Sequence, residues 1–370
     1  MSHPSTDAVT LLAAWRRAGH LTPEATPAAA AAIVAAHRDA EPPLHLKILS
    51  AIGTFLATCF FLAFLGVSGL ISFDTGAGLI GWGVVFLAAG IGLSFALAGK
   101  PAGLAHDFLA QAAFAALAVG KVLVVGGAFE QFGVDTRWVP TVALLVVTVA
   151  TYPVSASSLD RLLSPYATFA AALVEILDRG RFGPGTGTAL TLYFGFALAV
   201  AGGLLLSHRV PMALRPIGLA ALGAVGTVVC FLASGRDFAI WTTRAPVDPR
   251  AMEAMLALAL VGLVAWAAGG VARLATPPLA AAALGILALA AAGAPGIVFA
   301  LALLLLGHAR HDTPMRVVGI LALPAFLVLW YYGRDADFLA KSAMLVGSGA
   351  LLLGARGVMA ALGWDREETR

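Results

Sequence analysis

The sequence is poor in charged residues and almost free of cysteine. Aspartate, glutamate, lysine and arginine make up 12% of its 370 residues, about half the share found in an ordinary soluble domain. Hydrophobic residues make up 60%, and so little polar surface cannot cover that much apolar material in water. The two cysteines, Cys59 and Cys230, lie in separate apolar segments, so we expect neither a disulfide framework nor a cysteine metal site. Lipid is therefore the expected solvent for most of the chain.

Two further absences narrow the range of partners. The 23 lysines and arginines give a net charge of only +3 and are scattered in ones and twos between apolar runs, which is typical of membrane topology signals and not of a nucleic-acid surface. The first 46 residues lack the apolar core of a secretory signal, so we expect no cleavable leader. The expected partner is the lipid bilayer, together with a further membrane protein or a second copy of the chain. We expect no nucleic acid and no cofactor, and the sequence names no small-molecule ligand.

Apolar runs separated by short polar breaks recur along most of the chain, and each needs roughly 20 residues to cross the hydrocarbon. The run 279–309 is interrupted by Gly293-Ala294-Pro295-Gly296, and it forms either a tight hairpin of two short spans or one broken helix. The sequence therefore predicts an all-α, polytopic transmembrane helix bundle of about twelve spans, within a range of about 10–12. The predicted spans are 48–71, 78–98, 105–129, 138–154, 162–178, 186–206, 214–233, 251–272, 279–309, 317–332 and 338–361.

Short polar segments flank the membrane domain, which we place at residues 47–362. Residues 1–46 are expected to form a cytoplasmic cap of two short helices, the first ending near Gly19 and the second at Pro42-Pro43. Residues 363–370 form a short polar tail. With both termini inside, the cytoplasmic side holds twice as many lysines and arginines as the other side, which favours cytoplasmic termini. The inverted orientation is the alternative.

Glycine is dense in several of the predicted spans. Gly76, Gly81 and Gly83 are one example, and Gly218, Gly223 and Gly226 are another. Lipid tails provide no hydrophobic drive between helices, so close approach through small residues has to supply the contacts. The glycines therefore predict tightly packed helices.

Lys121 is the ionisable residue that membrane insertion explains least. It lies eight residues before Phe129, roughly 10 Å along the helix axis, which is deeper than a lysine comfortably snorkels. A charge at the centre of a span costs about 2.5–3.5 kcal/mol on insertion scales. We expect Lys121 to face the interior of the bundle and to pair with a carboxylate or with backbone carbonyls. Asp107 and Glu175 are candidate partners, although both lie within a turn of their span ends and can reach the interface instead.

A second group of polar residues surrounds the turn before the last predicted span. Tyr331 and Tyr332 lie just before Arg334, and Lys341 stands one turn into the following helix. An aromatic belt at the membrane interface and a snorkelling lysine would explain these residues without any further function. The alternative is the outer mouth of a binding site.

Pro295 and Gly296 form a candidate helix break between two short apolar halves. Such a break leaves backbone groups unpaired at some depth, which membranes tolerate only where protein or a water-filled cavity covers them. Broken helices line substrate sites in many transporters, whereas the alternative here is a tight turn at the outer surface. His308 and His311 share a loop but have no third or fourth ligand nearby, so we expect no metal site.

The C-terminal third of the chain resembles a known family. Three motifs, Gly293-Ala294-Pro295-Gly296-Ile297, Trp330-Tyr331-Tyr332 and Phe338-Leu339-Ala340-Lys341-Ser342, are similar to the bacterial membrane family called domain of unknown function 4401. In hydropathy the resemblance extends over roughly residues 45–360. The segment 15–24 also resembles the opening of the related family numbered 2157. The resemblance implies a multi-pass protein of the bacterial cytoplasmic (inner) membrane, and it assigns no catalytic residue because the family has no assigned activity.

Two functions fit these observations. Transport of a small solute, as in a permease, is favoured by the number of spans, by Lys121 and by the Pro295-Gly296 break. The alternative is a non-enzymatic membrane scaffold or accessory subunit, favoured by the absence of internal repeats. The spans contain neither an acid pair nor a nucleophile with a base, so we expect that the protein is not an enzyme.

Overall fold

The computed structural model describes residues 75–97, 104–132, 138–155, 157–180, 185–207, 210–233 and 249–332, together with isolated positions before and after them. Within these residues the regular structure is entirely helical, without any strand. The chain divides into two compact units, Met1–Ser164 and Pro165–Arg370. Apart from isolated positions, the cap 1–46, the predicted spans 48–71 and 338–361, Lys341 and the tail 363–370 lie outside the described residues.

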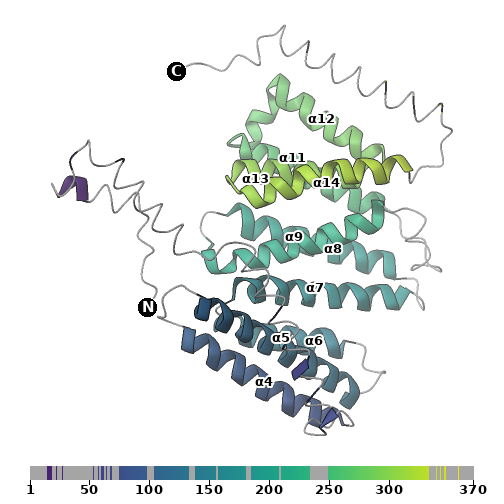
Figure 1. Cartoon of the computed structure of the whole chain (residues 1–370). Coiled ribbons are helices and arrows are strands. Elements are labelled where there is room, and N and C mark those ends of the chain that lie inside the picture. The colour runs from purple at the N-terminus through teal and green to yellow at the C-terminus, as the bar shows by residue number, and fades with distance from the viewer. Residues whose placement is uncertain are drawn as a thin grey trace. The chain divides into compact units, whose positions relative to one another are not determined.

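The first unit contains α4 (Gly76–Leu97), α5 (Leu104–Phe132), α6 (Val139–Thr151) and the start of α7 (Ser158–Gly180). Helices α4 and α5 pack along most of their length, and α6 packs against α5 (Figure 1). The division between the units falls inside α7, after Ser164.

Glycines bring α4 and α5 into backbone contact. A Cβ added at Gly83 would lie 2.9 Å from the carbonyl oxygen of Gly120, and one added at Gly127 would lie 2.5 Å from that of Gly76. These pairings run in opposite directions along the two helices, so the helices are antiparallel. Glycines recur every seven residues on each helix, and a seven-residue repeat keeps them on one face. The predicted tight packing is confirmed at Gly76 and Gly83, whereas a Cβ at Gly81 would meet nothing within 4 Å.

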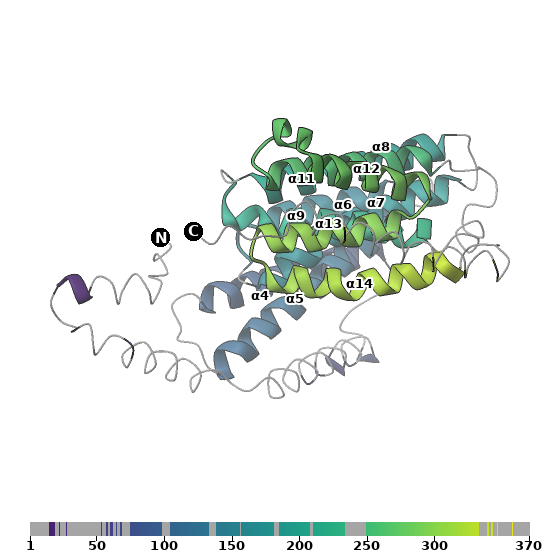
Figure 2. The same ribbon diagram turned by 90° about the horizontal axis from the view of Figure 1, so that it is seen from above.

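The second unit is built around α13. This helix packs against α9, α11 and α14, and α8 packs against α9 and α11; both views show α13 beside α14 (Figures 1 and 2). Side chains such as Val225 and Val228 of α9 and Val298 of α13 are almost completely buried between these helices. The elements of this unit are α8 (Thr186–Leu206), α9 (Arg215–Ala233), α11 (Arg250–Ala267), α12 (Pro277–Ala291), α13 (Pro295–Ala309) and α14 (Thr313–Tyr332), with the 3₁₀ helices η1 (Met212–Leu214) and η2 (Val271–Ala275).

Six helical segments in the described part of the chain are long and apolar enough to cross a membrane. They are Gly76–Leu97, Phe108–Phe132, Thr186–Leu206, Met212–Ala233, Arg250–Ala267 and Thr313–Tyr332. The all-helical, membrane-type fold is therefore confirmed, but the count of twelve spans is not supported. Length excludes three helices, because α6 has 13 residues and α12 and α13 have 15 each, only about 20 Å of helix. Helix α7 carries several charged side chains, and the predicted spans 48–71 and 338–361 lie outside the described residues.

The polarity of the surface is that of a protein in lipid. Large apolar side chains point outward on many helices, with Val122 of α5 and Leu192 of α8 respectively 71% and 69% exposed. Charged and hydroxyl side chains such as Lys121 and Thr148 are buried instead. A soluble monomer rarely exposes apolar surface over so much of its outside, so the exposed side chains fit contact with a bilayer.

Candidate functional site

Lys121 lies in the interior of the first unit, near the middle of α5. Only 6% of its side chain is exposed. It precedes the end of the helix at Phe132 by eleven residues, about 16 Å along the axis, and it lies one residue from the midpoint of the candidate span Phe108–Phe132. Because α5 continues three residues beyond the predicted end at Phe129, Lys121 is deeper than the sequence indicated.

Lys121 pairs with a carboxylate and a hydroxyl group from α7. Its Nζ donates hydrogen bonds to Oδ1 of Asp160 and to Oγ of Ser164, both at 2.6 Å. The Oγ of Ser164 donates to the same Oδ1 at 2.9 Å. Asp160 and Ser164 are four residues apart and therefore lie on one helix face, and both are buried. We call Lys121, Asp160 and Ser164 the buried triad.

The buried triad has hydrogen-bonding capacity to spare. An ammonium group carries three N–H donors, and a carboxylate accepts at both of its oxygens. Among the described residues, Lys121 uses two donors and the second oxygen of Asp160 accepts no hydrogen bond. The ion pair therefore leaves one N–H of Lys121 and one oxygen of Asp160 for a further hydrogen bond.

The sequence before α7 explains how Asp160 comes to face Lys121. The Oγ of Ser157 accepts a hydrogen bond from the backbone N–H of Asp160 at 3.4 Å, which is the three-residue spacing of a capping box. A carboxylate in the first turn is also favoured by the helix dipole. The predicted span 162–178 begins after Asp160 and therefore does not include it. The Ser157-Ser158-Leu159-Asp160 pattern is the signal that could have revealed it.

The connection between α6 and α7 lies at the level of Lys121. Helix α6 is about 20 Å long and begins seven residues after α5 ends. It packs against α5 and runs back along it, so its last residue, Thr151, is about as deep as Lys121. The contact between Lys121 and Asp160, two residues into α7, requires the same depth. Helix α6 thus covers only part of the roughly 30 Å of hydrocarbon.

Buried polar groups surround this connection. Thr148, Thr151 and Ser155 are all 5% exposed or less. The backbone N–H of Ser155 donates to the carbonyl of Thr151 at 2.9 Å. The guanidinium carbon of Arg161 lies 6.0 Å from the centre of the Tyr152 ring, at the outer limit of a cation–π contact. Irregular backbone at membrane depth occurs where protein covers it or where it lines a water-filled cavity, so the α6–α7 connection and the buried triad together form the candidate site.

The other predicted site residues do not belong to the buried triad. Glu175 is half-buried in α7, within the second unit. Asp107 lies in the first turn of α5, and its side chain and the whole of Lys341 are outside the described residues. Tyr331 and Tyr332 end α14 with their rings 5.2 Å apart in an edge-to-face arrangement, and Tyr332 is 75% exposed. Such an exposed tyrosine at a helix end suits a membrane interface.

The candidate helix break is a tight turn between two separate helices, α12 and α13. The N–H of Ala294 donates to the carbonyl of Leu289 at 3.2 Å, and that of Gly293 donates to Ala290 at 2.8 Å. Gly293 has a φ of +62°, so α12 ends in a Schellman motif. Pro295 is the first residue of α13, where its missing N–H would be unpaired in any case. These backbone groups are therefore satisfied, and of the two alternatives drawn from the sequence the structure shows the tight turn.

Gly296 serves packing, because an added Cβ would overlap the ring of Phe326 and lie 2.9 Å from its Cβ. We expect Gly296→Ala to lower the free energy of unfolding by about 1–3 kcal/mol through overpacking. Gly285→Ala is the matched control, since nothing lies within 4 Å of a Cβ there and alanine is the better helix former by up to about 1 kcal/mol. Denaturant unfolding in detergent, followed by circular dichroism, compares the two variants. Equal stability of both would contradict this role of Gly296.

His308 and His311 are explained by the turn between α13 and α14. His311 has a φ of +53° and donates its N–H to the carbonyl of His308 at 3.1 Å, while Asp312 donates to the carbonyl of Gly307 at 2.9 Å. This is again a Schellman motif, with histidine where glycine is usual. Within the part of the chain that the structure describes, no three His, Cys, Asp or Glu side chains are grouped to hold a metal ion.

One of three comparisons with known proteins gives a match. No curated protein and no solved structure matches the chain. The resemblance of residues 15–24 to the family numbered 2157 is not shown. A family model described as a domain of unknown function, DUF4401, matches residues 43–362, which include every described helix from α4 to α14. The chain therefore belongs to the DUF4401 family.

Proposed function

We propose that the protein spans the bacterial inner membrane several times and transports a small polar solute past the buried triad. One observation carries the proposal: the ion pair between Lys121 and Asp160, at 2.6 Å, lies about half-way along an apolar helix of spanning length. Burying charge at that depth is costly, and such residues commonly mark a solute or ion pathway. Helix α6 stops at the same depth, as the discontinuous helices of transporters do at their binding sites.

The charge around the site favours an anionic solute. Lys121 and Arg161 contribute two positive charges, and Asp160 contributes one negative charge. The N-terminus of α7 adds a partial positive charge at the same place. We therefore propose a small anion, such as a carboxylate or an inorganic ion, that takes the donors left unused by Lys121.

The proposal includes cytoplasmic termini and no enzymatic activity. The proposed orientation is supported by a difference in residue type between the two ends of the second unit. Arg215, Arg310 and Arg316 lie where α9 and α14 begin, whereas Trp330 and Tyr332 lie where α14 ends. Arginine is enriched on the cytoplasmic side of membranes and aromatic residues at the interfaces.

Uptake by the full-length protein in liposomes tests the proposal. We expect electrical currents on solid-supported membranes when small anions, including chloride, phosphate and acetate, are supplied in turn. The double variant Lys121→Met/Asp160→Leu should abolish the current while keeping an apolar interior. Val122→Met is the matched control, because residue 122 is exposed on the outside of α5 and should retain the current. Folded wild-type protein that carries none of these anions would refute the transport of small anions.

The closed geometry of the ion pair supports a second function, a non-enzymatic scaffold or accessory subunit. At 2.6 Å and nearly complete burial, Lys121 and Asp160 can simply fix α5 against α7. A scaffold should co-purify with another membrane protein, or with a second copy, after gentle extraction. Wild-type protein that is isolated alone and monomeric would contradict it.

A further inference from the structure

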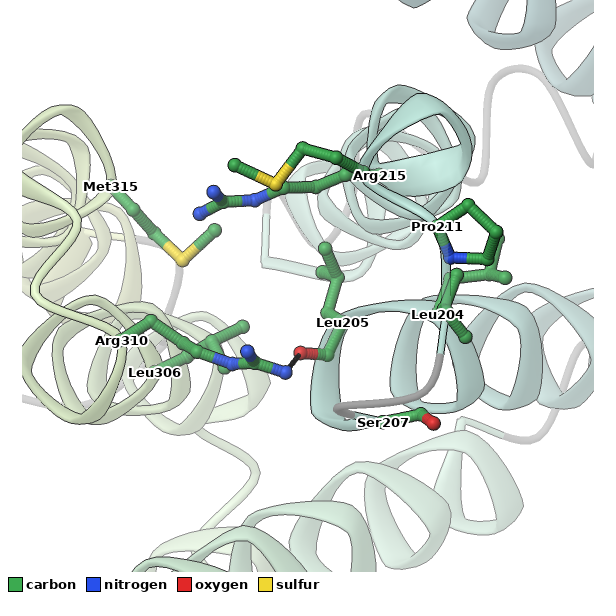
Figure 3. Close-up of a pocket in the computed structure, with 10 residues that line it drawn as sticks. Leu204, Leu205, Ser207, Pro211, Arg215, Leu306, Arg310 and Met315 are labelled. Carbon is green, nitrogen blue, oxygen red and sulfur yellow. Dashed lines mark hydrogen bonds between the residues drawn. The ribbon is translucent and has the colours of Figure 1, made fainter. Parts of the chain in front are cut away.

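A pocket of about 170 Å³ lies where several helices of the second unit end. Its walls come from Leu204 and Leu205 of α8, Leu306 of α13, Met315 of α14, and two arginines, Arg215 and Arg310 (Figure 3). Three candidate spans terminate here, because α8 ends and α9 and α14 begin. The pocket is therefore at the border between the apolar layer and water.

Specific contacts hold the two arginines in place. Nη2 of Arg215 donates to Oδ2 of Asp312 at 2.6 Å, and the other oxygen of Asp312 accepts the N–H of Met315 at 3.1 Å, which caps α14. Arg310 donates to the carbonyl of Leu205 across the pocket (Figure 3). Its guanidinium carbon also lies 5.5 Å from the centre of the Trp266 ring. The turn before α14 is thus tied to both α8 and α9.

The pocket carries excess positive charge and unused donors. Arg215 and Arg310 bring two positive charges, and Asp312 brings one negative charge. Each guanidinium has five N–H donors, and among the described residues each donates one hydrogen bond to a neighbour. The Nε of Arg310 is buried and has no hydrogen-bond partner. A buried donor without an acceptor is unfavourable. The other unused N–H groups of the two guanidiniums can donate to an anion in the pocket.

We propose that this pocket binds a phosphate group. The planar fork of a guanidinium matches two phosphate oxygens, which makes arginine a strong phosphate ligand. The apolar side chains of Leu204, Leu205 and Met315 suit the carbon atoms next to a lipid phosphate, and the pocket lies at the level of lipid headgroups. An anionic phospholipid and free inorganic phosphate share this recognition chemistry.

Binding to the full-length protein in neutral detergent tests the proposal. Phosphatidylglycerol, phosphatidylcholine and inorganic phosphate are added separately, with native mass spectrometry for lipid binding and the midpoint of thermal unfolding for all three. We expect phosphatidylglycerol to bind roughly tenfold more tightly than phosphatidylcholine and to raise the unfolding temperature. Arg310→Gln should reduce this affinity by roughly tenfold. Arg273→Gln is the control, because Arg273 is an exposed arginine of the same unit and loses the same charge.

A second variant keeps both arginines and thereby covers the case in which Arg310→Gln unfolds the protein. Ser207→Asp places a carboxylate at the rim of the pocket, where Ser207 lies, and should compete with the bound phosphate. Protection by inorganic phosphate that also displaces the lipid would identify free phosphate as the ligand. Protection by phosphatidylglycerol alone would identify the lipid. Equal binding of both lipids with no effect of phosphate, or equal losses in Arg310→Gln and Arg273→Gln, would overturn the proposal.

Discussion

Lys121→Met is expected to lower the free energy of unfolding of the full-length protein by about 3–5 kcal/mol. The substitution leaves the carboxylate of Asp160 buried without its cation, and it removes the ammonium donor from Ser164. An unpaired charge in the interior is much more costly than the loss of the pair as a whole. Reversible unfolding in bicelles or mild detergent, followed by helical circular dichroism, measures the effect.

A double variant distinguishes the cost of leaving one buried charge unpaired from the cost of removing both charges. Lys121→Met/Asp160→Leu replaces both charges with apolar side chains and should recover most of the lost stability, because buried pairs are often no better than well-packed apolar residues. Val122→Met should change the free energy of unfolding by less than about 0.5 kcal/mol, as expected for an exposed position. Two outcomes would contradict an energetic coupling between Lys121 and Asp160. The first is a loss of less than about 1 kcal/mol in the free energy of unfolding of the single variant. The second is a double variant that is as unstable as the single one.

Gly127→Ala is expected to force α4 and α5 apart. Its Cβ would lie 2.5 Å from the carbonyl oxygen of Gly76 and 2.8 Å from the backbone nitrogen of Ile80. Backbone atoms cannot rotate away as a side chain can, so we expect the free energy of unfolding to fall by about 2–3 kcal/mol, the upper part of the range for overpacking. The same unfolding measurement in detergent detects the loss.

The neighbouring glycine provides the control for this prediction. A Cβ at Gly126 would meet nothing within 4 Å, and alanine favours the helix by up to about 1 kcal/mol. Gly126→Ala should therefore be as stable as the wild type or slightly more stable. If both alanine variants had equal stability, the contact between α4 and α5 would not depend on Gly127.

The burial of Lys121 could be expected from the sequence, but its partner could not be identified from it. The length of the apolar run around Lys121 measures how far the amine is from water, and this requires no knowledge of neighbouring helices. The partner is 39 residues away along the chain, on a helix whose start we placed four residues too late. A prediction that is one helical turn too late leaves Asp160 in a loop, so the pattern gives no reason to pair this carboxylate with Lys121.

The turn at Gly293 illustrates the same limit. The Gly293-Ala294-Pro295-Gly296 pattern was sufficient to indicate an interruption, because glycine and proline act on the local backbone. Whether the interruption leaves backbone groups unpaired depends on hydrogen bonds around the turn, and those of the Schellman motif satisfy them. The packing of Gly296 against Phe326, thirty residues further along the chain, was not accessible from a local pattern.

Composition and the lengths of the apolar runs are enough to indicate a helical membrane protein and to single out Lys121 within it. Both follow from the transfer of single segments from water to lipid, which depends on composition and run length alone. The packing of the helices, in contrast, brings Asp160 and Ser164 to Lys121. It also places the end of α6 at that depth and joins Arg215 to Asp312 across 97 residues. These contacts depend on which helices pack together, and a largely uniform apolar sequence carries little information about that choice.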